Sequence, residues 1–117
     1  MTDQYLYQNA KLPQCPVETT LEVISTRWGA LIVRDLLNGP LRYKELQRSL
    51  GDISQKVLTE NLRQLEARGI LTRTVYEQVP PRVEYKLTEL GQSMRTLFDA
   101  LWAWGEHYQE VVAQSQL

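Results

Sequence analysis

The sequence of 117 residues contains one cysteine, one histidine and no long hydrophobic run. A lone cysteine, Cys15, excludes an intrachain disulfide, and one chain cannot build a four-thiolate zinc site or an iron–sulfur cluster from it. His107 has no carboxylate pair, glycine-rich phosphate loop or nucleophile around it in a catalytic spacing. We therefore expect a protein that is not an enzyme and that holds no metal and no cofactor.

The sequence also lacks the features of membrane insertion. No stretch approaches the roughly 18 to 20 uncharged apolar residues of a membrane span, and residues 1–4 lack the basic and apolar regions of a signal peptide. A composition of 43% hydrophobic and 23% charged residues is typical of a soluble globular domain. We expect a cytoplasmic protein without membrane contact, in which residues 1–14 form an N-terminal arm and residues 15–117 form one domain.

Charge is unevenly distributed, although the net charge is only −1. Residues 1–26 carry −2 and residues 88–117 carry −3, whereas residues 27–87 have eleven positive against seven negative side chains, a net +4. A basic middle between acidic ends favours an acidic partner for the middle, such as nucleic acid.

Apolar residues recur at helical spacing in four segments between residues 16 and 69. The first helix begins at Pro16, and the second runs from Arg27 to the turn at residues 38–40. The third is short and ends at Gly51, and Ser54 is a good N-cap for the fourth, which ends at Gly69. Two short helices joined by a tight turn, the second of them amphipathic, predict a helix-turn-helix pair.

After residue 69 the period changes from helix to strand. Residues 72–77 and 82–87 alternate between polar and apolar side chains, and both prolines of this region lie in the loop between them. A hairpin directly after a helix-turn-helix is a wing, and a short extra strand fits near Leu41. Thr88 then caps one long last helix, whose apolar stripe extends from Leu90 to Val111. The predicted fold is a mostly α winged helix-turn-helix, with N- and C-terminal helices for dimerisation.

Four sequence blocks in this order resemble the HxlR-type family of bacterial winged helix-turn-helix transcriptional regulators, over roughly residues 15–105. The blocks are CPVETTL at 15–21, LNGPLRYKEL at 37–46, ISQKVLT at 53–59 and VPPRVEYKLTELG at 79–91. The resemblance implies a homodimer that docks the fourth helix in the major groove of double-stranded DNA and its wing near the minor groove. It also implies switching of target genes, in some members by oxidation of an N-terminal cysteine.

The exposed face of the fourth helix is the predicted base-reading surface. A helical wheel places Lys56, Glu60 and Arg63 opposite the leucines, with Thr59 and Gln64 beside them and Gln55 nearer the edge. Arg or Lys suits guanine, Gln suits adenine, and Thr suits the methyl of thymine. The carboxylate of Glu60 repels phosphate unless it accepts from cytosine or pairs with Arg63 or Lys56. The alternative is a merely solvated helix face.

Phosphate contacts are predicted for residues that flank this helix, although surface solubility explains the individual cations about as well. The candidates are Arg42, Lys44, Arg48 and Ser54. Arg82 lies beside the two prolines at the expected wing tip, where a narrow minor groove attracts arginine. A cross-strand ion pair is the competing interpretation of Arg82.

Cys15 precedes Pro16 at a helix N-terminus, where the helix dipole favours thiolate, while nearby Glu18 opposes it. A lone cysteine is more often simply a small apolar residue, but the resemblance favours a redox-sensing role. Because the chain has no second cysteine, oxidation would give a symmetric Cys15–Cys15 bridge or a mixed disulfide with a small thiol.

The last helix is the predicted dimer interface, because a domain of this size cannot easily cover so much apolar surface. Its interface residues are Leu97, Leu101, Trp104 and Tyr108; an intrachain core is the alternative.

We expect a homodimeric, sequence-specific DNA-binding transcriptional regulator that acts on an inverted repeat, as a repressor in preference to an activator. The sequence is compatible with regulation by a small-molecule or oxidant effector. The competing function is a winged-helix protein-interaction module without DNA binding, which would carry an apolar patch in place of Lys56, Arg63 and Arg82.

Overall fold

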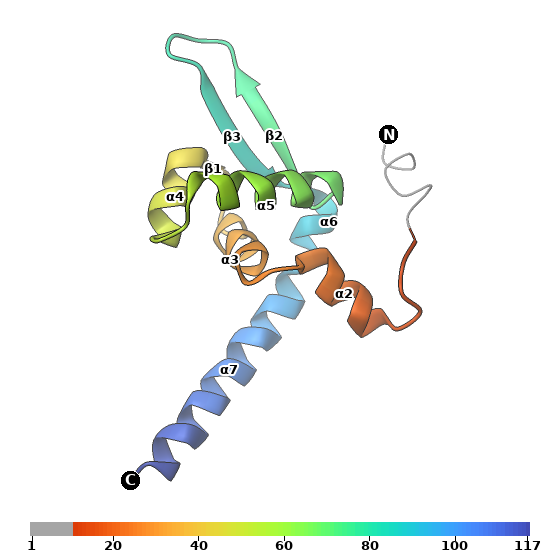
Figure 1. Cartoon of the computed structure of the whole chain (residues 1–117), viewed down its shortest axis with the longest axis vertical. Coiled ribbons are helices and arrows are strands. Elements are labelled where there is room, and N and C mark those ends of the chain that lie inside the picture. Colours follow the sequence, from red (N-terminus) through yellow and green to blue (C-terminus); the bar gives the residue numbers. More distant parts are fainter. Residues whose placement is uncertain (1–10) are drawn as a thin grey trace.

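The computed structural model describes residues 11–117, so most of the predicted arm lies outside it. The body holds a bundle of helices beside a small sheet, and a long helix projects from it (Figure 1). The elements are α2 (Pro16–Ile24), α3 (Arg27–Leu36), β1 (Leu41–Arg42), α4 (Tyr43–Leu50), α5 (Gln55–Ala67), β2 (Leu71–Tyr76), β3 (Arg82–Leu87), α6 (Glu89–Gln92) and α7 (Arg95–Ser115). The four predicted helices before the wing, the hairpin and the extra strand near Leu41 are confirmed.

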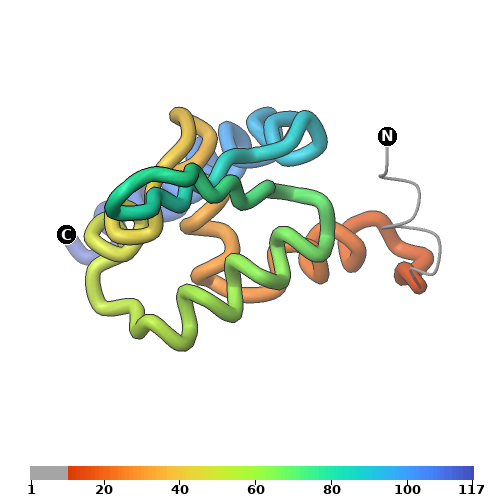
Figure 2. Tube along the Cα trace, turned by 90° about the horizontal axis from the view of Figure 1, so that it is seen from above, coloured from red at the N-terminus to blue at the C-terminus, as the bar shows by residue number. Residues whose placement is uncertain are grey.

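The core lies where α3, α4 and α5 meet the sheet. Helices of this kind bury one apolar stripe each, because side chains three and four residues apart share a face. The largest fully buried side chains are Ile32, Val33, Leu36, Leu46, Leu58, Leu62, Leu65 and Leu71. Seen from above, α5 runs along one side of the body, with α4 near its start and α2 near its end (Figure 2).

The sheet has three antiparallel strands in the order β1-β3-β2. Leu41 pairs with Tyr85 and Leu71 pairs with Leu87, and the side chains of Tyr85 and Leu87 are buried in the core. The far ends of β2 and β3 form the wing, which extends away from the body (Figure 1); the side chains there are exposed on β2 and half-buried on β3. The central position of β3 thus anchors the wing to the helix-turn-helix.

Helix starts are fixed by hydroxyl caps. Thr26 accepts a hydrogen bond from the Gly29 amide at 3.0 Å, and Ser54 accepts one from the Val57 amide at 3.2 Å. These bonds satisfy amides that have no partner within the helix. Gly51 ends α4 with φ of 71°, a backbone conformation that favours glycine. The turn of the helix-turn-helix therefore follows from local chemistry at residues 51–54.

The prediction of one long last helix is wrong, because the chain forms a short α6 and a separate α7. Thr88 caps α6 through the Gly91 amide, as predicted, but its hydroxyl also lies 2.6 Å from the Gly69 carbonyl. Ser93 and Met94 form the break: the Met94 amide donates to the Gly91 carbonyl only three residues back. The Leu90 carbonyl accepts from both the hydroxyl and the amide of Ser93, whereas in a continuing helix it would accept from the Met94 amide. α6 therefore ends at Gln92, and α7 begins separately at Arg95.

No helix in the described part of the chain has the length and hydropathy that a membrane span requires. The dimensions along the principal axes are 56 × 38 × 23 Å. The longest of these reflects the wing and α7, which point away from the body in opposite directions (Figure 1).

Candidate nucleic-acid interface

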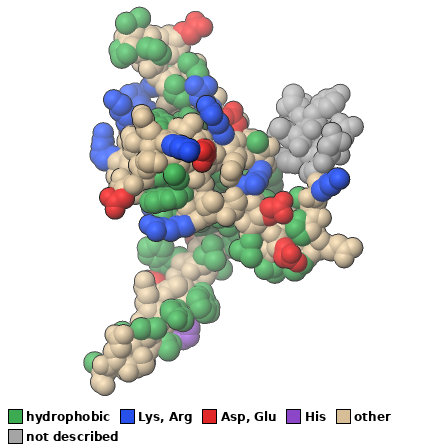
Figure 3. All heavy atoms as spheres, in the orientation of Figure 1, with side chains coloured by type: hydrophobic (Ala, Val, Ile, Leu, Met, Phe, Trp, Pro, Cys, Tyr) green, Lys and Arg blue, Asp and Glu red, His purple; other side chains and the backbone are tan. Residues whose placement is uncertain are grey.

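The outer face of α5 is polar, as predicted, and carries the cations Lys56 and Arg63 together with the carboxylates Glu60 and Glu66. Gln55, Lys56, Glu60 and Arg63 are exposed, and Thr59 is half-buried. Lys and Arg side chains lie over the α4 and α5 region of the body, whereas the shaft of α7 carries hydrophobic side chains (Figure 3). An open hollow of about 500 Å³ lies on this face. It is lined by Tyr43, Gln55, Lys56, Thr59, Glu60 and Arg63.

Tyr43 belongs to this face, and the sequence pattern did not identify it. Its ring packs against the core, but its hydroxyl reaches α5, where it donates to the Gln55 carbonyl at 3.2 Å and lies 3.1 Å from the Thr59 hydroxyl. Tyrosine often presents an apolar body and a polar tip. The apolar spacing along α4 predicts that the ring of Tyr43 is buried, but it gives no information on the contacts of the hydroxyl.

For Glu60, one of the two alternatives left open by the sequence is excluded, and Gln64 has a contact that the sequence did not indicate. Within residues 11–117 the only ion pair joins Arg34 and Asp35, so Glu60 pairs neither with Lys56 nor with Arg63. Gln64 accepts a hydrogen bond from the Ser25 hydroxyl at 3.3 Å, which ties the end of α5 to the turn after α2. The carboxylate of Glu60 is therefore free to accept from a ligand.

The predicted phosphate-contacting residues are all exposed beside α5. Arg42 is the N-cap of α4, where its amide donates to the Glu45 carboxylate at 2.8 Å, and Lys44 and Arg48 lie along the same helix. Ser54 accepts from the Val57 amide, so its own O–H stays available to donate. None of these four residues lines the hollow itself.

Arg82 lies at the first position of β3, opposite Tyr76, instead of at the tip of the loop. Its guanidinium carbon lies 4.2 Å from the centroid of the Tyr76 ring, a cation–π contact. Its Nε is buried and has no hydrogen-bond partner in the described chain. The expected alternative, a cross-strand ion pair, is wrong because the register places an aromatic ring opposite the cation.

Cys15 is exposed and is the N-cap residue of α2. Its side chain makes no capping hydrogen bond, while its carbonyl accepts from the Thr19 amide at 3.1 Å. The position that the sequence predicted, a thiol at the start of a helix, is confirmed. The structure leaves that thiol open to solvent.

The predicted interface residues of α7 divide into two groups. Leu97 is half-buried next to the body, whereas Leu101, Trp104 and Tyr108 are exposed, with Trp104 at 64%. The rings of Trp104 and Tyr108 stack with centroids 5.4 Å apart. α2 adds further exposed apolar side chains, Val17 at 66% and Leu21 at 64%. The intrachain core therefore ends at about Phe98, and the rest of α7 is uncovered in a single chain.

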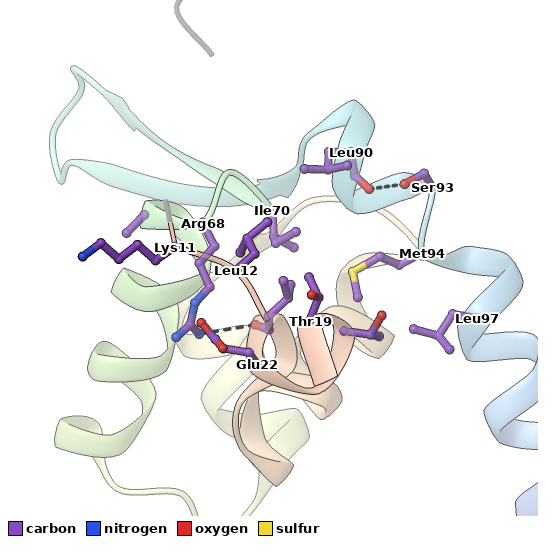
Figure 4. A pocket seen from close by; sticks show the side chains of 13 residues that line it. Lys11, Leu12, Thr19, Glu22, Arg68, Ile70, Leu90, Ser93, Met94 and Leu97 are labelled. Carbon is purple, nitrogen blue, oxygen red and sulfur yellow. Dashed lines mark hydrogen bonds between the residues drawn. The ribbon is translucent and has the colours of Figure 1, made fainter. Parts of the chain in front are cut away.

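A mainly apolar cavity of about 720 Å³ lies between α2, the end of α5, α6 and the start of α7. Figure 4 shows Leu12, Ile70, Met94 and Leu97 around it. The Arg68 guanidinium at its edge donates to the Val23 carbonyl at 3.3 Å. Among the described residues no group of three or more His, Cys, Asp or Glu side chains is placed to hold a metal ion.

Comparison with known proteins agrees with this architecture. The family model described as HxlR-like helix-turn-helix matches residues 23–113. The HTH-type transcriptional regulator YkvN of Bacillus subtilis is 47% identical over 96 residues, which are 82% of this chain and 81% of that protein.

Solved structures are similar as well. The redox regulator HypR in its reduced form is 41% identical, with a TM-score of 0.80, over 86% of this chain and 99% of that one. The reduced form of YodB from B. subtilis is 36% identical, with a TM-score of 0.72, over 82% of this chain and 95% of that one. The residues that the family model matches include the helix-turn-helix, the wing and most of α7. The chain belongs to the HxlR-like helix-turn-helix family of transcriptional regulators, as the resemblance of its four sequence blocks predicted.

Proposed function

We propose that this protein binds a specific site in double-stranded DNA, with α5 in the major groove and the wing beside the adjacent minor groove. The observation that carries the proposal is the face of α5: an exposed row of amide, hydroxyl and cationic side chains next to a projecting hairpin. Gln55, Lys56, Thr59 and Arg63 read base edges. Arg42, Lys44, Ser54 and Arg82 contact the backbone and set the register.

The protein acts as a symmetric homodimer through α7 and α2. At 100° per residue, the exposed apolar residues of α7 cover about half of its circumference, and Asp99, Glu106 and Glu110 lie on the other half. A second copy can cover this surface and the apolar residues of α2 by two-fold symmetry. Two copies of α5 about 34 Å apart would then meet successive major grooves, which calls for an inverted repeat.

The dimer represses its target genes in the cytoplasm and responds to oxidants through Cys15. The similar structures include HypR, which is described as a redox regulator, and the Cys15 thiol is exposed at a helix start. An oxidant such as diamide would take two electrons and two protons from two Cys15 thiols, which then form one disulfide between subunits. The apolar cavity between α2 and α7 offers the place for a small-molecule effector.

The observations do not favour a protein-interaction module. Such a module needs an apolar patch on the exposed face of α5. The exposed residues of α5 are Gln55, Lys56, Glu60, Arg63, Gln64, Glu66 and Ala67, and the one apolar residue among them, Ala67, is too small to form a patch. The large exposed apolar surface lies on α7, at the opposite end of the molecule from the wing (Figure 3).

A selection from random double-stranded oligonucleotides tests the DNA-binding proposal. The expected outcome is an inverted repeat whose affinity falls steeply as salt increases, because several phosphates are neutralised. Arg63→Ala should weaken binding, and Lys11→Ala, which removes the same charge at the cavity near α2, should bind as the wild type does. No enriched site, together with a flat salt response, would contradict the proposal.

A further inference from the structure

The hydroxyl of Tyr43 connects α4 to the base-reading face of α5 through two hydrogen bonds. One joins it to the Gln55 carbonyl at 3.2 Å, and the other joins it to the Thr59 hydroxyl at 3.1 Å. All three groups lie around the hollow on the face of α5. We call this chain of groups the hydroxyl relay.

The chemistry of the groups fixes the direction of the relay. A carbonyl oxygen only accepts, so Tyr43 must donate its single proton to Gln55. The bond between the two hydroxyls then has to use the proton of Thr59, with the Tyr43 oxygen as acceptor. The only hydroxyl proton of Thr59 is therefore used within the protein. Towards a ligand in the hollow, the Thr59 oxygen can only accept a hydrogen bond.

An acceptor that cannot donate distinguishes bases. In the major groove adenine presents the N6 amino group and cytosine presents the N4 amino group, whereas guanine presents only acceptors and thymine presents an acceptor oxygen and its methyl group. A free threonine hydroxyl could rotate to serve either kind of base. One held by Tyr43 can bond only to an amino group.

We propose that Tyr43 is a specificity-determining residue, which makes Thr59 an acceptor-only group and so selects adenine or cytosine at the base position facing it. The inference rests on the proposed docking of α5 in the major groove. Tyr43 itself is a positioning residue, because it acts through Thr59.

The test compares base preferences in parallel selections with full-length variants. The wild type should prefer adenine or cytosine over guanine and thymine, on one defined strand, at one position of each half-site. Tyr43→Phe keeps the ring in the core and removes the relay, so the preference at that position should fall about threefold to tenfold, the effect of one hydrogen bond. Preferences at all other positions should stay unchanged, which a merely structural role of the ring would not explain.

Matched variants separate the hydroxyl from other effects. Tyr85→Phe removes the hydroxyl of a tyrosine on β3 that does not line the hollow, and should leave every preference unchanged. Thr59→Ser keeps the hydroxyl and should keep the preference, whereas Thr59→Val keeps the shape and should lose it. Circular dichroism and thermal melts of each variant verify that it is folded.

Each outcome decides a separate question. Specific binding by the wild type with an unchanged profile for Tyr43→Phe overturns the relay and leaves the proposed function intact. A preference for thymine that survives in Thr59→Val shows that the methyl group reads the base, and this also overturns the relay. Absence of any specific site in the wild type overturns the proposed function and the relay together.

Discussion

Arg82 and Tyr76 face each other across the wing, and the guanidinium carbon lies 4.2 Å from the centroid of the ring. They are the last paired residues before the loop of the hairpin. The ring holds a long, flexible cation against the sheet, so part of its conformational entropy is lost before any ligand arrives. Because Arg82 is pre-ordered at the base of the wing loop, it suits a contact with the DNA phosphate backbone better than insertion into the minor groove.

We predict that Arg82→Ala weakens binding to all DNA sequences alike and reduces the slope of log affinity against log salt by about one. Tyr76→Leu leaves the charge but removes the ring beneath it, so it should cost about 0.5 to 1 kcal/mol of binding free energy without a change in the slope. Fluorescence anisotropy titrations over a series of salt concentrations measure both quantities. An unchanged slope for Arg82→Ala would show that the wing does not touch phosphate.

The junction between α2 and α3 depends on a close approach at Gly29. A Cβ at this position would lie 2.2 Å from the Ile24 carbonyl oxygen, which is backbone and cannot easily move. Gly29→Ala should therefore lower the free energy of unfolding by about 1 to 3 kcal/mol, the usual cost of overpacking. In an unobstructed helix the same exchange raises stability by roughly 0.5 to 1 kcal/mol. Urea unfolding gives the sign, and a stabilised variant would contradict the contact.

The elements of the helix-turn-helix were predictable because each carries a local signal. Ser54 caps α5 and Gly51 ends α4, and neither feature depends on a distant residue. The break between α6 and α7 was not predictable from the same kind of signal. At Gly91, in α6, a Cβ would lie 2.2 Å from the Ile70 carbonyl oxygen, so only glycine allows this close approach. A tertiary contact with the turn before β2 therefore holds α6 in place.

The structure confirms that the residues predicted on the outer face of α5 point away from the core, but their contacts with other elements were not predicted. A helical wheel shows which residues of α5 point outward, but it gives no information on what another helix adds, so Tyr43 was missed. The surroundings of Arg82 required the strand register, since a shift by one residue places a different side chain opposite it. Sequence periodicity therefore predicts which residues face outward, but it does not predict which side chains of different elements contact one another.

The exposed thiol of Cys15 gives a prediction on regulation. Diamide or peroxide should change the DNA affinity of the wild type, and a reducing agent should restore it. Cys15→Ser should bind DNA as the reduced wild type does and should not respond to oxidant, because the chain has no other thiol. Non-reducing gel electrophoresis distinguishes a Cys15–Cys15 dimer from a mixed disulfide. An oxidant response that persists in Cys15→Ser would assign the effect to another group.

The exposed half of α7 gives the prediction on assembly. Trp104 is 64% exposed and stacks on Tyr108, so in a single chain a large aromatic surface faces water. Trp104→Glu should leave the core intact, because the side chain contributes nothing to it, and should raise the dimer dissociation constant at least about thirtyfold, as expected for an interface tryptophan. Sedimentation equilibrium at micromolar protein measures this constant for both proteins.

A second variant controls for the added charge. Ala103→Glu introduces the same carboxylate on the acidic side of the helix, near Asp99 and Glu106, and should remain dimeric. If dimerisation couples two recognition helices, the loss of the dimer should also lower affinity for an inverted repeat far more than affinity for a single half-site, since the second contact becomes bimolecular. A folded Trp104→Glu protein that stays dimeric and keeps full affinity would remove α7 from the interface.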